Sequence, residues 1–139
     1  MHHGIPPELV QAYKETDYFV HADPTFKMRI GQPCPELTCL MGARNANCAA
    51  FITAWNPFSQ QLSPKENEQR QHELKAQLKT RGLSFIDGIG QHPSNEWPGE
   101  PSVLILNLNR ESAKVLAAQY EQNAFVWIGE AAVPELVQR

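Results

Sequence analysis

The stretch from Ala49 to Trp55 is the feature that most constrains what this chain can fold into. Its side chains are apolar at nearly every position, without the alternation of polar and apolar residues typical of a strand with one face in water. A strand of this kind lies near the middle of a sheet that is covered on both faces. We therefore expect a domain in which helices pack against a central β-sheet.

Length and charge narrow the class of protein. The 139 residues are 42% hydrophobic and 19% charged, which fits one globular domain. Twelve Lys and Arg residues stand against 15 Asp and Glu, and no basic block appears, so bulk binding of nucleic acid is disfavoured. No apolar run approaches the roughly 20 residues that a membrane span needs. The N-terminus lacks the apolar core of a signal peptide, and we expect a cytoplasmic protein without membrane contact.

Four helices are predicted, over residues 7–15, 36–43, 63–81 and 109–120. The third has the strongest local signal, because Ser63 is a good N-cap, Pro64 suits the first helical position and Glu66 completes a capping box. Gly82 is expected to end that helix in the left-handed conformation.

Six strands are predicted, over residues 18–21, 26–30, 49–55, 83–86, 103–106 and 124–128. Residues 87–101 are predicted as a long irregular loop, and residues 134–139 as a short helical turn or a tail. Two strand–helix–strand units stand out, 49–86 and 102–128, and a parallel crossover in either should be right-handed. The fold class is therefore α+β, with a mixed β-sheet of about five or six strands packed with three or four helices. We expect a single domain over residues 1–139, with a peripheral N-terminal helix (1–15) and a C-terminal tail (130–139).

Polar side chains occur where the third helix should turn an apolar stripe inward. Asn67 and Arg70 lie three residues apart, on the side that Leu74 and Leu78 continue. Polar groups facing an interior cost free energy unless they have partners. Arg70 therefore either binds an anionic ligand or pairs with an internal carboxylate such as Glu100 or Asp87.

The ends of the central strand and of the predicted long loop carry further candidates. Asn56 either presents its amide to a ligand or merely caps the turn before Pro57. Trp97 is either a stacking platform for a ring or a plug over the core. Glu100 is either a general base or the partner of Arg70, and His92 is expected to be exposed to solvent.

Common cofactor and metal motifs are absent from the sequence. It contains no Gly-Lys-Ser/Thr phosphate loop, no Gly-x-Gly-x-x-Gly after a strand and no Gly-x-Ser-x-Gly elbow. Cys34, Cys39 and Cys48 match no common zinc spacing and are expected to be small buried thiols. No cofactor and no metal site are predicted.

Several of these segments together resemble one known family. They are Phe51–Pro57 with Leu62, Ser63, Asn67 and Arg70; Trp97 with Glu100–Ser102; and Gln122–Ala124. This pattern, from about Tyr18 to Val137, resembles the bacterial family catalogued as domain of unknown function 3293. The resemblance implies a small bacterial domain and no particular activity. It suggests that the polar residues in the pattern belong together.

Two functions from different classes follow. The first is a polar pocket for an anionic or amide-rich small ligand, for example a nucleotide, with a wall made of Asn56, Ser59, Asn67, Arg70, Trp97, Glu100, Gln122 and Asn123. The alternative is a protein-interaction or regulatory module, in which the polar cluster is structural and an exposed apolar patch binds the partner. Phe58, Phe125 and Trp127 are the candidates for that patch. An enzyme ranks third and would need Glu100 or His92 within reach of the pocket.

Overall fold

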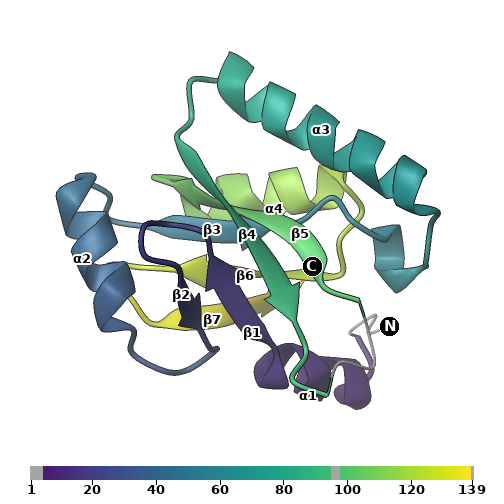
Figure 1. Ribbon diagram of the computed structural model, residues 1–139, viewed down its shortest axis with the longest axis horizontal. Helices are drawn as coiled ribbons and strands as arrows, with labels where there is room; N and C mark the ends of the chain where they lie inside the picture. The colour runs from purple at the N-terminus through teal and green to yellow at the C-terminus, as the bar shows by residue number, and fades with distance from the viewer. Residues whose placement is uncertain (1–4, 95–97, 139) are drawn as a thin grey trace.

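The computed structural model describes residues 5–94 and 98–138, which form one seven-stranded sheet and four α-helices (Figure 1). The α+β class and the single domain are as predicted. The helices are α1 (Pro7–Glu15), α2 (Pro35–Ala43), α3 (Pro64–Thr80) and α4 (Arg110–Gln119), with one 3₁₀ turn, η1 (Pro57–Ser59). The strands are β1 (Asp17–Val20), β2 (Phe26–Met28), β3 (Ala49–Ile52), β4 (Phe85–Gln91), β5 (Glu100–Leu106), β6 (Ala124–Ile128) and β7 (Pro134–Gln138).

The sheet has the order β2-β1-β4-β5-β3-β6-β7, and every neighbouring pair is antiparallel. The predicted strand number, about five or six, is close to the seven observed, whereas the prediction of a mixed sheet is wrong because the sheet is wholly antiparallel. Both strand–helix–strand units exist, and the strands of each run in the same direction. In each unit a third strand separates the two parallel strands: β5 lies between β3 and β4, and β3 lies between β5 and β6. The segment from β3 to β6 thus has the split β-α-β, ferredoxin-like topology.

Two sequence segments form strands that were not predicted. Within residues 87–101, predicted as a loop, residues 87–91 extend β4 and residues 100–101 begin β5, and these two strands pair antiparallel. Glycines made that segment look irregular, but Gly88 is required by packing: a Cβ atom there would clash with the Phe19 carbonyl oxygen and would lie 2.8 Å from the ring of Phe51. Residues 134–138, predicted as a helical turn or tail, form the edge strand β7.

Helices cover one face of the sheet, and α3 and α4 lie together on it (Figure 1). Leu74 and Leu78 of α3 and Leu116 of α4 pack there against Ile52 and Ile105. The capping box predicted at the start of α3 is present, and Gly82 follows the helix with a φ of 71°. Local sequence signals therefore suffice to predict where α3 begins and ends.

The other face of the sheet curls inward. The two edge strands approach each other, so that the Gly31 N–H just after β2 donates to the Pro134 carbonyl of β7 at 2.8 Å. Leu37 and Met41 of α2 pack against the inner face at one end of the curl. Helix α1 lies at the opposite end (Figure 1) and buries none of its residues. The two ends of the curled sheet are therefore filled very differently.

The remaining expectations have mixed outcomes. Of the three cysteines, all free, Cys34 is buried as predicted, whereas Cys39 is exposed and Cys48 is half-buried. None of the helices in the described part of the chain is long and apolar enough to cross a membrane.

Candidate functional site

The chain that leaves β3 is held by side chains instead of a neighbouring strand. The Ala54 N–H donates to Gln71 Oε1 at 3.0 Å, and the Asn56 N–H donates to Asn67 Oδ1 at 2.8 Å. Both acceptors belong to α3 and are buried, with exposed fractions of 7% and 2%. The polar stripe of α3 therefore satisfies backbone groups that would otherwise be buried without a partner.

Arg70 also holds the chain that leaves β3. Its Nε donates to the Ala54 carbonyl at 2.8 Å, and its Nη2 donates to the Tyr120 carbonyl at 2.6 Å. Its Nη1 lies 3.4 Å from Oε1 of Glu121. The internal carboxylate that pairs with Arg70 is thus Glu121, and neither of the two named from the sequence, Glu100 and Asp87.

Asn56 connects this cluster to Glu100. Its Oδ1 accepts from the Leu62 N–H at 3.0 Å and from Asn67 Nδ2 at 2.8 Å, while its Nδ2 donates to Glu100 Oε2 at 3.1 Å. The backbone of Asn56 is left-handed, with a φ of 48°, and Phe58 follows at 50°. Such a conformation is strained for a bulky residue, and strain of this kind concentrates at functional sites.

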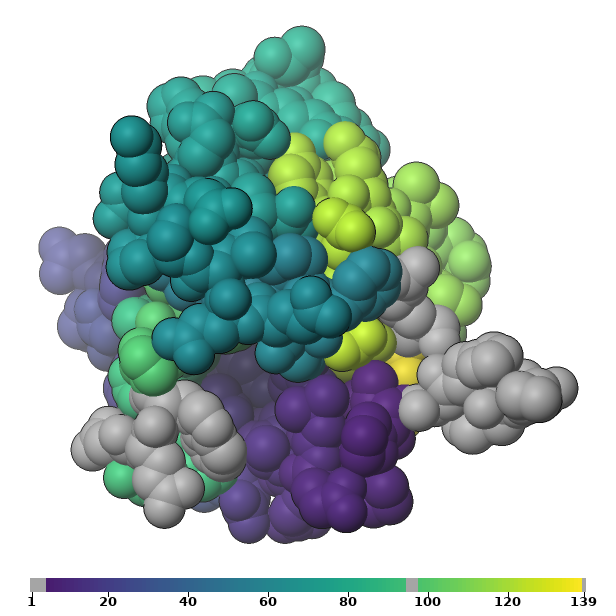
Figure 2. All heavy atoms as spheres, turned by 90° about the vertical axis from the view of Figure 1, so that its right-hand side faces the viewer, coloured from purple at the N-terminus to yellow at the C-terminus, as the bar shows by residue number. Residues whose placement is uncertain are grey.

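A cavity of about 730 Å³ opens at the α1 end of the curled sheet. In Figure 2 the surface is hollowed between α1, in purple, and the teal segment that leads into α3. The inner faces of β3, β5 and β6 form its floor. Glu100 and Ser102 belong to this inner row because they alternate in register with the inward Leu104 and Leu106. At the α2 end of the curled sheet the corresponding space is filled by packed side chains, whereas at the α1 end it forms the cavity.

Glu100 is the acidic residue on the described part of the cavity wall. Burial raises the pKa of its carboxyl, and the hydrogen bond from Asn56 opposes that rise. Among the described residues, its Oε1 has no hydrogen-bond partner and its carboxylate forms no ion pair. A carboxyl in this setting can pair with a ligand or transfer a proton.

Two tyrosines line the cavity beside Glu100. Burial raises the pKa of the Tyr13 hydroxyl to about 12; the nearby charge of Glu100 acts in the same direction, and a hydrogen bond with Ser59 opposes both. The Tyr18 hydroxyl donates to the Tyr13 carbonyl at 2.7 Å, and burial raises its pKa as well. Both hydroxyls therefore stay protonated at neutral pH.

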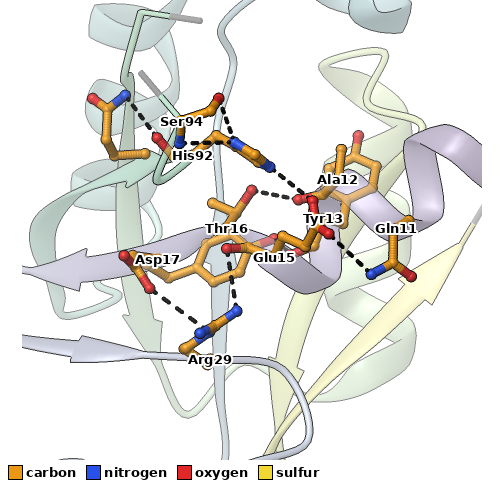
Figure 3. A network of polar contacts seen from close by, with 11 residues as sticks. Gln11, Ala12, Tyr13, Glu15, Thr16, Asp17, Arg29, His92 and Ser94 are labelled. Atoms are coloured by element: carbon orange, nitrogen blue, oxygen red, sulfur yellow. Dashed lines mark hydrogen bonds and ion pairs between the residues drawn. The ribbon is translucent and has the colours of Figure 1, made fainter. Parts of the chain in front are cut away.

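A polar network ties α1 to the end of β4 (Figure 3). His92 Nε2 lies 3.0 Å from Oε1 of Glu15, and the Ser94 N–H donates to His92 Nδ1 at 3.2 Å. The hydrogen bond from His92 is the main cause that lowers the pKa of Glu15, followed by one from Gln11. The His92 side chain is only 14% exposed, so the prediction that it is exposed to solvent is wrong.

The structure brings most of the predicted site residues to this cavity. Its wall includes Asn56, Ser59, Asn67, Glu100 and Gln122. Arg70 and Asn123 are not among the described residues that line it, although Asn123 Nδ2 donates to Ser59 Oγ at 3.1 Å. Trp97 lies outside the described residues.

Two important residues were missed by sequence reasoning. The buried Gln71 follows Asn67 by four positions and precedes Leu78 by seven, so helical spacing alone would have found it. Tyr13 lies in the predicted helix over residues 7–15, and nothing in its sequence context indicated a cavity.

The apolar patch proposed for the alternative function is not assembled. Phe125 is buried, with 4% exposed, and the half-buried Trp127 donates its indole N–H to the Leu108 carbonyl at 3.0 Å. Phe58 is 44% exposed. Within residues 5–94 and 98–138, no group of three His, Cys, Asp or Glu side chains is placed to hold a metal ion.

Comparison with known proteins identifies a family. A family model described as "Protein of unknown function (DUF3293)" matches residues 52–125, which is 74 of the 139 residues. The chain belongs to this family. The matched range spans all eight predicted site residues, from Asn56 to Asn123, whereas α1 and β1 precede it. No curated protein and no solved structure matches the chain.

Proposed function

We propose that this protein binds a small organic molecule in the cavity at the α1 end of the curled sheet. The observation that carries the proposal is the cavity itself, about 730 Å³ on an inner face that is tightly packed elsewhere. Binding sites for small molecules typically occupy about 300–1,000 Å³ and are mostly apolar, with a few polar groups that fix the ligand. A hollow of this size takes the place of side-chain packing that would stabilise a small domain, and binding a ligand explains why it is there.

The composition of the wall favours an amphipathic ligand. Aromatic residues line the space: Tyr13, Tyr18, Phe51 and Trp55. Between them lie a few polar groups, Glu100, Gln122 and Ser59 among them. An amide-bearing or hydroxyl-bearing molecule with an apolar body matches this arrangement.

A negatively charged ligand, also predicted from the sequence, is not part of the proposal. Its predicted partner was Arg70, which instead holds two carbonyls and Glu121. No lysine or arginine appears among the described residues of the cavity wall, where Glu100 would repel an anion. Nucleotides are therefore poor candidates.

Thermal-shift screening tests the proposal, since a ligand that binds only the folded chain raises the melting temperature by mass action. The screen should cover amines, amino acids, amides, nucleosides and small aromatic metabolites at millimolar concentration. A hit should lose its effect in Ala12→Phe, which fills the cavity from α1. It should survive in Gln11→Phe, a matched change at an exposed position of the same helix. A screen without hits, or hits that bind Ala12→Phe as well as the wild type, would contradict the proposal.

We also infer that the protein acts in the bacterial cytoplasm. Three free thiols, one of them exposed, suit a reducing compartment. Localisation of a tagged chain by cell fractionation is the direct measurement, and recovery from an oxidising compartment would overturn this inference.

A further inference from the structure

The cavity contains an acidic group whose charge the described residues leave without a partner. Glu100 extends from β5 into the inner row, and one of its oxygens is held by Asn56. Its other oxygen accepts no hydrogen bond from any described residue, and no described Lys or Arg reaches the carboxylate. A half-buried carboxylate that faces no cation is less well solvated than one in water, so a cation brought by a ligand would reduce that penalty.

The position of Glu100 is fixed before any ligand arrives. Asn56, which holds the carboxylate, is itself held by contacts from Leu62 and from the buried Asn67. A group held in this way loses little conformational entropy when it binds, which favours affinity. The polar cluster of α3 therefore supports Glu100 instead of binding the ligand directly.

The rest of the wall also suits a positive charge. The aromatic side chains around the cavity present electron-rich rings, and cations bind favourably over such rings. Gln122 adds an acceptor: its Nε2 donates to the Trp55 and Tyr120 carbonyls at 3.1 and 3.2 Å, while its Oε1 has no hydrogen-bond partner among the described residues. The wall therefore offers acceptors and aromatic rings to a cation; His92 also lines it, and no described Lys or Arg does.

We propose that the cavity selects a small organic cation, a protonated amine on an apolar body, by pairing the amine with Glu100. This inference rests on the proposed function, because it assigns a ligand class to the same cavity. The charge of the ligand distinguishes it from the broader proposal, which requires only that some small molecule binds.

Three probes that share an indole ring and differ in the charge of the head group test the inference. They are tryptamine, tryptophol and indole-3-acetate, titrated by calorimetry at about pH 8, where an amine and a carboxylate are both ionised. We expect tryptamine to bind the wild type at least about tenfold more tightly than tryptophol, from the strength of charge-assisted hydrogen bonds. Indole-3-acetate should bind most weakly.

Variants separate the role of Glu100 from a general effect of charge. Glu100→Gln keeps the shape and an acceptor for Asn56, and should reduce tryptamine affinity to the level of tryptophol while tryptophol affinity stays unchanged. Glu130→Gln changes the net charge equally at an exposed residue and should leave all three affinities as in the wild type.

Several results would overturn the inference. They are equal affinities for tryptamine and tryptophol in the wild type, equal losses in the two Glu→Gln variants, and binding of none of the probes. In each case the broader proposal is judged separately, by whether the thermal-shift screen finds any ligand that stabilises the wild type and not Ala12→Phe. The comparison of the three probes on the wild type needs no variant to fold.

Discussion

Replacing Asn67 with alanine should loosen the exit of β3 and lower the free energy of unfolding. The variant leaves the Asn56 N–H without an acceptor, which costs about 1–3 kcal/mol for a buried donor. It also removes the hydrogen bond from Asn67 Nδ2 to Asn56 Oδ1, worth about 0.5–1.5 kcal/mol. Alanine is a better helix former than asparagine by roughly 0.5 kcal/mol, which offsets part of the loss. The expected net destabilisation is about 1–4 kcal/mol.

Chemical denaturation in urea measures this difference, with the slope of the transition as a check that the unfolded state is unchanged. Gln69→Ala is the matched control, because it removes an exposed amide from the same helix, and it should change stability by less than about 0.5 kcal/mol. A double-mutant cycle of Asn56→Ala with Asn67→Ala should show coupling. If Asn67→Ala were as stable as Gln69→Ala, the assignment of Asn67 to the backbone clamp would be refuted.

Three further predictions address the other parts of the molecule. Arg70→Lys should destabilise the fold by about 1–3 kcal/mol, because lysine cannot hold both carbonyls at once. The variant should bind the ligand as tightly as the wild type. If a folded Arg70→Lys variant lost affinity, Arg70 would have to be part of the binding site. Gly88→Ala should destabilise by about 1–3 kcal/mol, because its Cβ would clash with the Phe19 carbonyl and with the Phe51 ring. Gly90→Ala, whose Cβ would have only ordinary contacts from 3.7 Å, should be nearly neutral, and equal melting temperatures would contradict this packing. Glu100→Gln should be more stable than the wild type at neutral pH. Burial raises the folded-state pKa of Glu100 above its unfolded value, so its contribution favours folding at low pH and is lost as the pH rises through that window. Melting curves across pH check this sign, and a variant less stable than the wild type at neutral pH would refute it.

The stability of Glu100→Gln also bears on function. A group that weakens the fold at neutral pH and yet occupies a cavity is best explained by what it binds, since activity and stability often compete at such sites. If the variant gained stability and lost tryptamine binding together, both observations would have one cause.

What the sequence determined by itself is the part of the fold that depends on near neighbours. The capping box at Ser63 and Glu66 and the apolar run of β3 each depend on residues a few positions apart, and both are present. The polar stripe of α3 was equally visible, because helical spacing places Asn67 beside Leu74 and Leu78. Its importance was therefore predictable, and its partners were not.

Only the tertiary structure decided what the stripe contacts and where the cavity lies. Arg70 binds carbonyls 16 and 50 residues away, and Asn56 reaches Glu100 across 44 residues. The pairing of β4 with β5 and the curl of the sheet set these distances, and the glycines of β4 disguised that pairing in the sequence. The cavity exists because α1 covers one end of the curl without burying any of its own residues there, whereas α2 fills the other end. No local pattern specifies such a space, because its size depends on how elements far apart in the chain pack against one another.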